Sequence, residues 1–219
     1  MTSIAIVGGH GNVARHLHPM LVAAGHTPVA LVRREDYRTE LEGLGAQMRL
    51  LDIEQDDAAA FAGAFEGCSA VVFAAGGGPD GNLERKRTVD LEGALKTIDG
   101  AGQAGISRVV QISAIGVDEP LGDDVSPVWR AYVEAKRDAD AALRDSGLDW
   151  TIIRPGRLTD DPPTGRVELA PQTSRGEVPR ADVAAVVAAV LDTGAGIGAQ
   201  WDLVGGDTEI GDALAVLSR

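Results

Sequence analysis

The sequence is poor in cysteine, and it has no long apolar run. Of its 219 residues one is a cysteine, Cys68, so the chain can form no intrachain disulfide and no cysteine-rich zinc site. The four histidines all lie within the first 26 residues, and we expect no metal site. The chain opens with no basic leader and no membrane-length apolar stretch, which indicates neither a signal peptide nor a membrane anchor. We therefore expect a reducing, cytoplasmic location.

Basic charge is also scarce. The chain has 20 lysine and arginine residues against 33 aspartate and glutamate residues, which gives a formal net charge of −13. Nucleic acid and anionic membrane surfaces repel such a chain, so we expect neither as a partner. The expected partner is a small-molecule substrate, and the chain is expected to be a monomer or a homodimer. Any local pair of basic residues is informative in this setting.

The sequence does contain short apolar runs that alternate with helical patterns. The runs are often β-branched and are bounded by glycine, aspartate or proline, which is typical of buried strands. They span residues 3–7, 28–32, 47–51, 70–75, 108–113, 150–154 and 200–204. Between them, apolar residues recur at helical spacing. This alternation predicts an α/β fold: one Rossmann-like domain over residues 1–219 with a doubly wound parallel sheet.

Two long segments without a regular pattern follow predicted strands, at residues 114–127 and 155–180. Ligands of open α/β sheets bind beyond the carboxyl ends of the strands. We therefore expect these segments to form the walls of a substrate pocket. The second one begins a small C-terminal substrate lobe at about residue 155.

A glycine-rich turn, GGHGNVA, follows the first run at residues 8–14. It can be read as G-x-G-x-x-A from Gly9 or as G-x-x-G-x-x-A from Gly8. Glycines let the backbone turn tightly and approach a pyrophosphate, which then faces a helix N-terminus. Simple packing is the alternative explanation. The expected cofactor contacts in this turn are Gly8, Gly9, His10, Gly11, Asn12 and Val13.

Two arginines, Arg33 and Arg34, follow the second run. In NAD-binding folds an acidic residue in this region binds the ribose 2′-hydroxyl, whereas a guanidinium suits a 2′-phosphate. The pattern favours NADP, with NAD second, although the next two residues are acidic and the four could form an ordinary solvated charge cluster. By position alone, the adenine contacts are expected to be Asp52 and Ile53, and the ribose contacts Ala74, Ala75 and Gly76.

A tyrosine and a lysine lie four residues apart in the predicted helix at 127–146. Tyr132 and Lys136 therefore share one helix face. A nearby ammonium lowers the pKa of a phenol, which can then exchange a proton with a carbonyl or an alcohol. Chance is a poor explanation, because the chain has two tyrosines and few lysines. Ser113, at the end of the fifth run, could hold the same substrate oxygen.

Taken together, these residues resemble the short-chain dehydrogenase/reductase superfamily. The likeness is closest to its atypical, compact members of the NAD(P)-binding, NmrA-like and NAD-dependent epimerase/dehydratase types. It spans nearly the whole chain and includes an RPG sequence at 154–156. The resemblance implies that Tyr132 moves the proton and that Lys136 lowers its pKa and binds the nicotinamide ribose. It also implies that Ser113 polarises the reacting oxygen, and that Pro155 and Gly156 lie against the nicotinamide.

The expected function is an NADP-dependent oxidoreductase that acts on a small carbonyl or alcohol. One alternative is an NADP-binding redox sensor without turnover, and another is a flavin or quinone reductase with an aromatic substrate near Trp129. The sequence departs from the family in having AAGGG in place of an asparagine-rich segment after the fourth strand. It also lacks a large C-terminal substrate domain, which argues against a sugar nucleotide as substrate.

Overall fold

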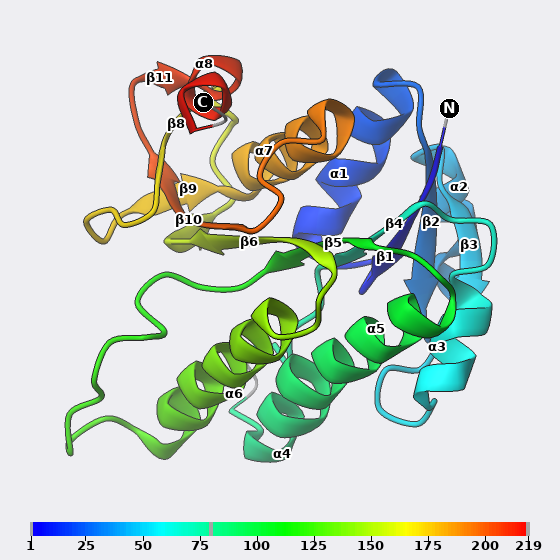
Figure 1. Ribbon diagram of the computed structural model, residues 1–219, viewed down its shortest axis with the longest axis horizontal. Coiled ribbons are helices and arrows are strands. Elements are labelled where there is room, and N and C mark those ends of the chain that lie inside the picture. The colour runs from blue at the N-terminus through cyan, green and yellow to red at the C-terminus, as the bar shows by residue number, and fades with distance from the viewer. Residues whose placement is uncertain (1, 79–80, 218–219) are drawn as a thin grey trace.

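The structure is a computed structural model that describes residues 2–78 and 81–217. The fold is centred on one twisted sheet, which Figure 1 shows edge-on. Within these residues nine strands follow the order β11-β8-β10-β6-β5-β4-β1-β2-β3. The seven strands from β10 to β3 are parallel to one another. They are β1 Ser3–Val7, β2 Thr27–Val32, β3 Gln47–Leu50, β4 Ala70–Phe73, β5 Arg108–Ile112, β6 Asp149–Pro155 and β10 Ala199–Gly205. All seven predicted runs form strands, and the predicted fold class is confirmed.

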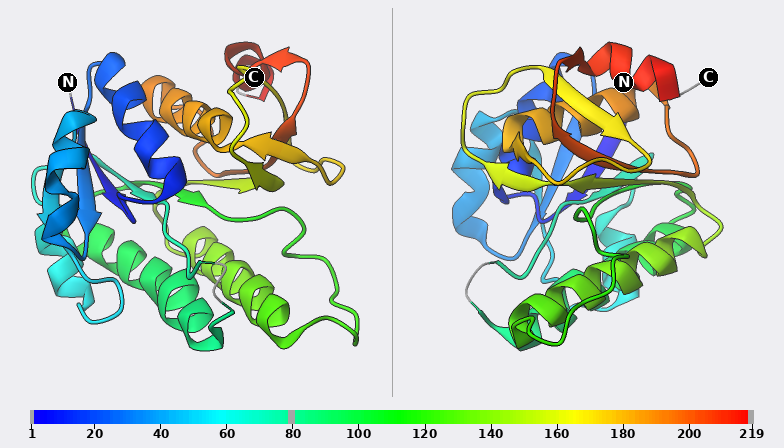
Figure 2. Two further views of the ribbon diagram at one scale, coloured as in Figure 1. Left: turned by 180° about the vertical axis from the view of Figure 1, so that it is seen from behind. Right: turned by 90° about the vertical axis from the view of Figure 1, so that its left-hand side faces the viewer.

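Helices cover both faces of the sheet. Figure 1 shows α1 and α7 on one side and α3, α5 and α6 on the other, and the two further views in Figure 2 agree. The bounds are α1 Asn12–Ala23, α2 Arg38–Gly43, α3 Ala58–Ala64, α4 Leu83–Arg85, α5 Glu92–Gln103, α6 Pro127–Arg144, α7 Arg180–Thr193 and α8 Ile210–Leu217. A 3₁₀ turn, η1, spans Glu35–Tyr37, and a π-helical turn, η2, spans Lys86–Leu91. None of the helices in the described residues is long and apolar enough to cross a membrane.

Burial on both faces explains why the strands appear as continuous apolar runs. In β1, Ile4 and Ile6 pack in the core beneath α1 and α7, whereas Ala5 and Val7 pack in the core beneath α3, α5 and α6. All four side chains are essentially inaccessible to solvent. A parallel strand buried in this way has no polar face, so its sequence shows no alternation.

The segment expected to be irregular, residues 155–180, contains three strands instead. They are β7 Arg157–Thr159, β8 Arg166–Ala170 and β9 Glu177–Pro179; β7 pairs with β9, while β8 pairs antiparallel with β10 and with β11 Thr208–Glu209. In β8 the buried Val167 and Leu169 alternate with exposed Arg166 and Glu168. The strand is short and lies among proline, glycine and threonine, which hid this alternation. The C-terminal part of the chain thus extends the sheet at its β10 edge.

The strand order places a crevice at the middle of the sheet. From β1 the chain continues to β2 and β3 on one side, and then crosses to β4, β5 and β6 on the other. At such a switch point the loops after two neighbouring strands lead away from each other and leave an opening at their carboxyl ends. Here the opening lies between the loops that follow β1 and β4.

Candidate cofactor-binding and active site

A cavity of about 250 Å³ lies at this switch point. Nine of the predicted cofactor contacts line it, namely Gly8, His10, Gly11, Arg33, Asp52, Ile53, Ala74, Ala75 and Gly76. They come from the loops after β1, β2, β3 and β4. The residues that were singled out because they follow strands therefore meet in one place.

The glycine turn packs closely against β2 and against the segment that follows β4. Gly8 has a φ of 80°, and a Cβ on it would lie 2.9 Å from Ala75. A Cβ on Gly9 would lie 2.7 Å from Ala30 in β2, and the Gly9 N–H donates to the carbonyl of Leu31 at 3.1 Å. Neither position has room for a side chain. Gly9 thus packs the turn against β2 and does not itself line the cavity.

Helix α1 begins at the end of this turn. Gly11 is its N-cap, and in the described part of the chain no side chain caps the helix there. The Gly11 N–H donates to the Gly8 carbonyl at 2.8 Å, so the next N–H groups, starting at Asn12 and Val13, are left for an outside acceptor. The side chains of these two residues do not line the cavity: Asn12 accepts a hydrogen bond from Arg15, and Val13 is buried in the core. This donor set at the positive end of a helix fits a pyrophosphate.

The two neighbouring arginines point to different places. Arg33 lines the cavity, whereas Arg34 donates to Asp36 at 2.7 Å and lies over the Tyr37 ring, outside the cavity wall. The backbone at Arg34 is extended, and successive side chains of an extended chain point in opposite directions. We expected both arginines near a 2′-phosphate, and the geometry favours Arg33.

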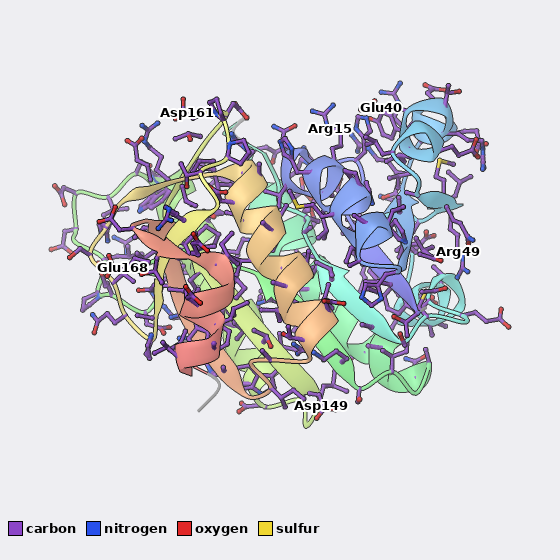
Figure 3. The ribbon with its side chains drawn as sticks, turned by 90° about the horizontal axis from the view of Figure 1, so that it is seen from above. Arg15, Glu40, Arg49, Asp149, Asp161 and Glu168 are labelled. Atoms are coloured by element: carbon purple, nitrogen blue, oxygen red, sulfur yellow. The ribbon has the colours of Figure 1, made fainter. Side chains whose placement is uncertain are left out.

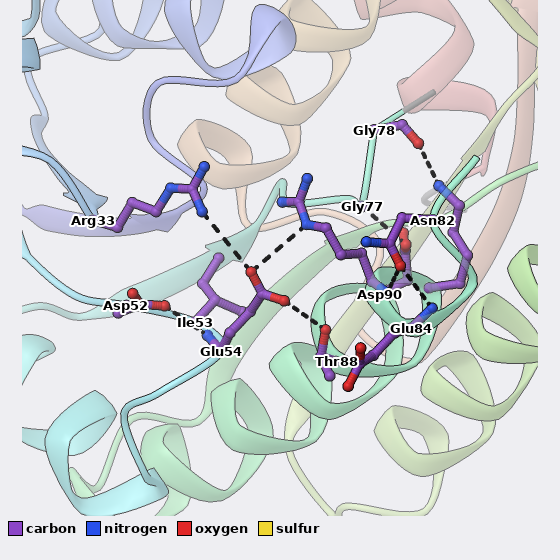
Figure 4. A network of polar contacts seen from close by, with 12 residues as sticks. Arg33, Asp52, Ile53, Glu54, Gly77, Gly78, Asn82, Glu84, Thr88 and Asp90 are labelled. Atoms are coloured by element: carbon purple, nitrogen blue, oxygen red, sulfur yellow. Dashed lines mark hydrogen bonds and ion pairs between the residues drawn. The ribbon is translucent and has the colours of Figure 1, made fainter. Parts of the chain in front are cut away.

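Glu54 lies between Arg33 and a second cavity-wall arginine, Arg85. Figure 4 shows Glu54 facing Arg33. Its Oε2 is 3.9 Å from Arg33 Nη1 and 3.6 Å from Arg85 Nε. Its Oε1 accepts a hydrogen bond from the Thr88 hydroxyl at 2.7 Å. We missed Glu54, although it directly follows the predicted adenine contacts. We also missed Arg85, which lies in the connection after β4, where no sequence pattern signals a site.

His10 joins the glycine turn to the segment after β2. Its ring stacks on Tyr37, another cavity residue, with centroids 3.6 Å apart, and its Nε2 lies 2.9 Å from Glu40 Oε2. Arg15 also donates a hydrogen bond to Glu40, at 3.1 Å, and Figure 3 shows these two residues close together. The hydrogen bonds from His10 and Arg15 hold the pKa of Glu40 below its usual value. These contacts fix the outer wall of the cavity.

Lys136 lies directly behind the cavity wall. Its Nζ is 3.3 Å from Asp90 Oδ1 and donates to the carbonyls of Ile112 at 3.3 Å and Ala75 at 3.4 Å. Asp90 belongs to the π-helical turn, and its Oδ2 accepts the Gly77 N–H at 2.9 Å. The ammonium thus donates hydrogen bonds to two carbonyls, whereas its contact with Asp90 Oδ1 is an ion pair without hydrogen-bond geometry among the described residues. Binding of a ribose hydroxyl would use the third ammonium hydrogen.

Tyr132 lies one turn before Lys136 on the same face of α6 and is half-buried. We expected Lys136 to lower the pKa of this phenol. Lys136 does so, but burial raises the pKa by more, and the nearby Asp90 adds to the increase. The expected net lowering was therefore wrong for the free protein, because burial of the phenol outweighs the effect of the lysine charge. Tyr132 remains a phenol near neutral pH.

Ser113 is bound to a buried carboxylate. Its hydroxyl donates to Asp140 Oδ2 at 2.8 Å, and the same carboxylate accepts hydrogen bonds from Gln111 at 2.7 Å and from Arg154 at 2.8 Å. Arg154 also donates a hydrogen bond through Nη1 to Asp118 Oδ2 at 2.7 Å. Because the single hydroxyl hydrogen of Ser113 is used on Asp140, its oxygen can only accept a hydrogen bond from another group. This geometry differs from the polarising donor role that the resemblance implies.

Pro155 and Gly156 lie outside the cavity, at the end of β6 and next to the end of β5. The Pro155 carbonyl accepts the Ile115 N–H at 3.0 Å, and the Gly156 N–H donates to Leu203 at 2.9 Å. A Cβ on Gly156 would lie 2.2 Å from the carbonyl oxygen of Gly176, so this position admits only glycine. Their expected contact with a nicotinamide stays a prediction.

The strand order, the glycine turn and the helix terminus at the switch point define a Rossmann-type nucleotide-binding protein. Residues 8–194 match the NAD(P)H-binding family, and the chain belongs to that family. Family membership supports the cofactor class, and it leaves the choice between NAD and NADP to the details of the site.

Relatives of this chain have different functional names. It is 36% identical over 215 residues to the Bacillus subtilis (strain 168) protein called "uncharacterized sugar epimerase YhfK", covering 98% of this chain and 99% of the relative. A solved structure from Bacillus halodurans, whose name places it in the NAD-dependent epimerase/dehydratase type, is 39% identical with a TM-score of 0.92, covering 99% and 100%. The oxidoreductase ylbE from Lactococcus lactis is 26% identical with a TM-score of 0.85, covering 98% and 96%. The names differ on the reaction.

Proposed function

We propose that the protein is an NADP-dependent oxidoreductase that interconverts a small carbonyl compound and its alcohol. The observation that carries the proposal is the position of Lys136, which contacts the cavity-wall residue Ala75 and lies one turn from Tyr132. The face of α6 that can transfer a proton therefore lies against the nucleotide cavity. A bound nicotinamide would supply or accept the hydride next to this face.

The residues of the chain have separate roles in this proposal. The glycine turn and the N-terminus of α1 bind the pyrophosphate, and Arg33 binds the 2′-phosphate. Tyr132 donates its hydroxyl proton to the carbonyl oxygen as the carbonyl carbon is reduced. Burial raises the pKa of Tyr132, so the phenol is protonated near neutral pH and has a proton to donate. Ser113 accepts a hydrogen bond from the tyrosine or from the product alcohol.

Cofactor titrations test the first half of the proposal. Wild type, Arg33→Ala and Arg34→Ala are each titrated with NADPH and NADH by calorimetry. We expect wild type to bind NADPH more tightly, and Arg33→Ala to weaken NADPH binding about tenfold or more, since hydrogen bonds to charged groups contribute about 1.5–3 kcal/mol. Arg34→Ala is the matched control and should retain most of the preference. Equal binding of both cofactors by wild type contradicts the assignment of NADP.

Turnover of the Tyr132→Phe variant tests the second half. NADPH oxidation is followed with a panel of aldehydes, ketones and quinones. We expect the substitution to reduce carbonyl turnover by a factor of about 10²–10⁴ and to leave NADPH affinity nearly unchanged. Undiminished turnover, with quinones as the best substrates, supports the flavin or quinone reductase. Tight NADPH binding with no turnover of any substrate supports the sensor.

The names of two relatives favour a second candidate, an epimerase. An epimerase removes and returns a hydride at one carbon, so the nicotinamide shows no net change. The same assays separate the two: net consumption of NADPH supports the oxidoreductase, whereas inversion of a sugar carbon without net consumption supports the epimerase.

A further inference from the structure

The roles proposed above do not explain Glu54, a carboxylate in the wall of a cavity that is expected to bind an anion. Its side chain is 24% exposed, and its backbone is held firmly. The Glu54 N–H donates to Asp52 Oδ1 at 2.9 Å, and Lys96 donates to the carbonyls of Ile53 at 2.8 Å and Glu54 at 3.4 Å. These hydrogen bonds fix the backbone at Glu54 and so define where its side chain begins.

The side chain of Glu54 is directed by three contacts. The hydroxyl of Thr88 holds one oxygen, and the other oxygen lies within 4 Å of both Arg33 and Arg85. Figure 4 shows the carboxylate with Arg33 on one side and Thr88 on the other. Arg33 is also the residue that suits a 2′-phosphate, so Glu54 lies where it competes with that phosphate for the guanidinium.

We propose that Glu54 is a specificity-determining residue that opposes the 2′-phosphate of NADP and supports the ribose 2′-hydroxyl of NAD; this rests on the proposed cofactor site. A carboxylate accepts a hydrogen bond from a ribose hydroxyl. It repels a phosphate monoester, which has a charge of about −1.5 to −2 at neutral pH. Arg33 and Glu54 therefore act on the same cofactor position in opposite directions. The preference for NADPH is smaller than Arg33 alone would give.

The test compares Glu54→Gln with wild type in titrations with NADPH and NADH at low and at high salt. The ratio of NADPH affinity to NADH affinity should rise about tenfold, mainly through tighter NADPH binding, and the rise should shrink at high salt. Glu35→Gln is the matched control, because Glu35 is an exposed carboxylate near the same sheet edge that pairs with Arg38. It should leave the ratio unchanged.

A second variant, Thr88→Val, keeps the charge of Glu54 and removes the hydrogen bond that holds its carboxylate. Thr88→Val frees the Glu54 carboxylate to turn away from Arg33, so it should shift the ratio toward NADPH by a smaller factor. A ratio that is unchanged or lower in both variants overturns the proposal. A lower ratio would mean that Glu54 orients Arg33 for the phosphate. Failure of wild type to bind either cofactor overturns the proposed function itself, and this result is distinct because it precedes any comparison of variants.

Discussion

Replacing Lys136 by methionine tests how far this residue holds the site together. The ammonium and the Asp90 carboxylate lie 3.3 Å apart, with side chains 5% and 0% exposed. Without the lysine, the buried carboxylate retains the Gly77 N–H as its partner in the structure. Removing one partner of a buried ion pair costs about 3–5 kcal/mol. We expect Lys136→Met to lower the free energy of unfolding, measured in urea, by about that amount.

The double variant Lys136→Met/Asp90→Asn shows whether the unpaired charge causes the loss. An asparagine amide still accepts the hydrogen bond from Gly77 and carries no charge. We expect the double variant to regain most of the lost stability, about 2–3 kcal/mol relative to Lys136→Met. Lys96→Met is the matched control, because Lys96 donates to two carbonyls, and its loss should cost about 1 kcal/mol. The reasoning would be refuted if Lys136→Met had the same free energy of unfolding as wild type, or if the double variant were no more stable than Lys136→Met.

Two further predictions concern the glycine turn. Gly9→Ala should destabilise the protein by about 1–3 kcal/mol and weaken NADPH binding, because the added Cβ would lie 2.7 Å from Ala30. Gly63→Ala is the control, because a Cβ on this helical glycine has open space; it should stabilise the protein by up to about 1 kcal/mol in the same urea assay. The second prediction concerns His18, which is buried and whose Nε2 lies 2.6 Å from the Gly9 carbonyl oxygen. Burial lowers the pKa of His18 from its usual 6.5. The unfolded chain therefore takes up a proton at a higher pH than the folded protein does, and the folded protein should lose stability as the pH falls from 6.5 to the pKa of the folded state. His18→Gln should flatten this loss in urea midpoints measured from pH 7.5 to 5, whereas the same change at exposed His16 should not; a wild-type midpoint that stays constant over this range contradicts the reasoning.

The parts of the fold that could be predicted are those in which one physical rule acts alone. A parallel strand buried on both faces must be apolar throughout, so β1, β2 and β4 are evident from the sequence. Strand β8 has one exposed face and five residues, and its alternation is too short to stand out among the turn residues around it. Its place in the sheet depends on pairing with β10, which is distant in the sequence.

The same distinction explains the site. Residues that follow strands could be placed, because the carboxyl ends of parallel strands meet at one edge, and Arg33 is an example. The direction of a side chain could not be predicted, and Arg34 turns away from the cavity. The partner of a charged group could not be predicted either, since Asp90, which pairs with Lys136, belongs to a π-helical turn far away in the sequence. The direction of the Tyr132 pKa was mispredicted because burial of the phenol, which residue spacing does not indicate, raises the pKa by more than Lys136 lowers it.

Charge pairing also indicates where cofactor selectivity can arise. Lys136 and Arg154 each face a fully buried carboxylate, and opening either pair would leave that charge uncompensated at a cost of several kcal/mol. Arg33 is different: its side chain is 54% exposed, and it lies 3.9 Å from a partly exposed Glu54. Such a pair contributes about 0–1 kcal/mol and exchanges partners readily. A 2′-phosphate can therefore compete for Arg33 at little cost, so cofactor selectivity is expected at the outer wall of the cavity, apart from the rigid pairs behind it.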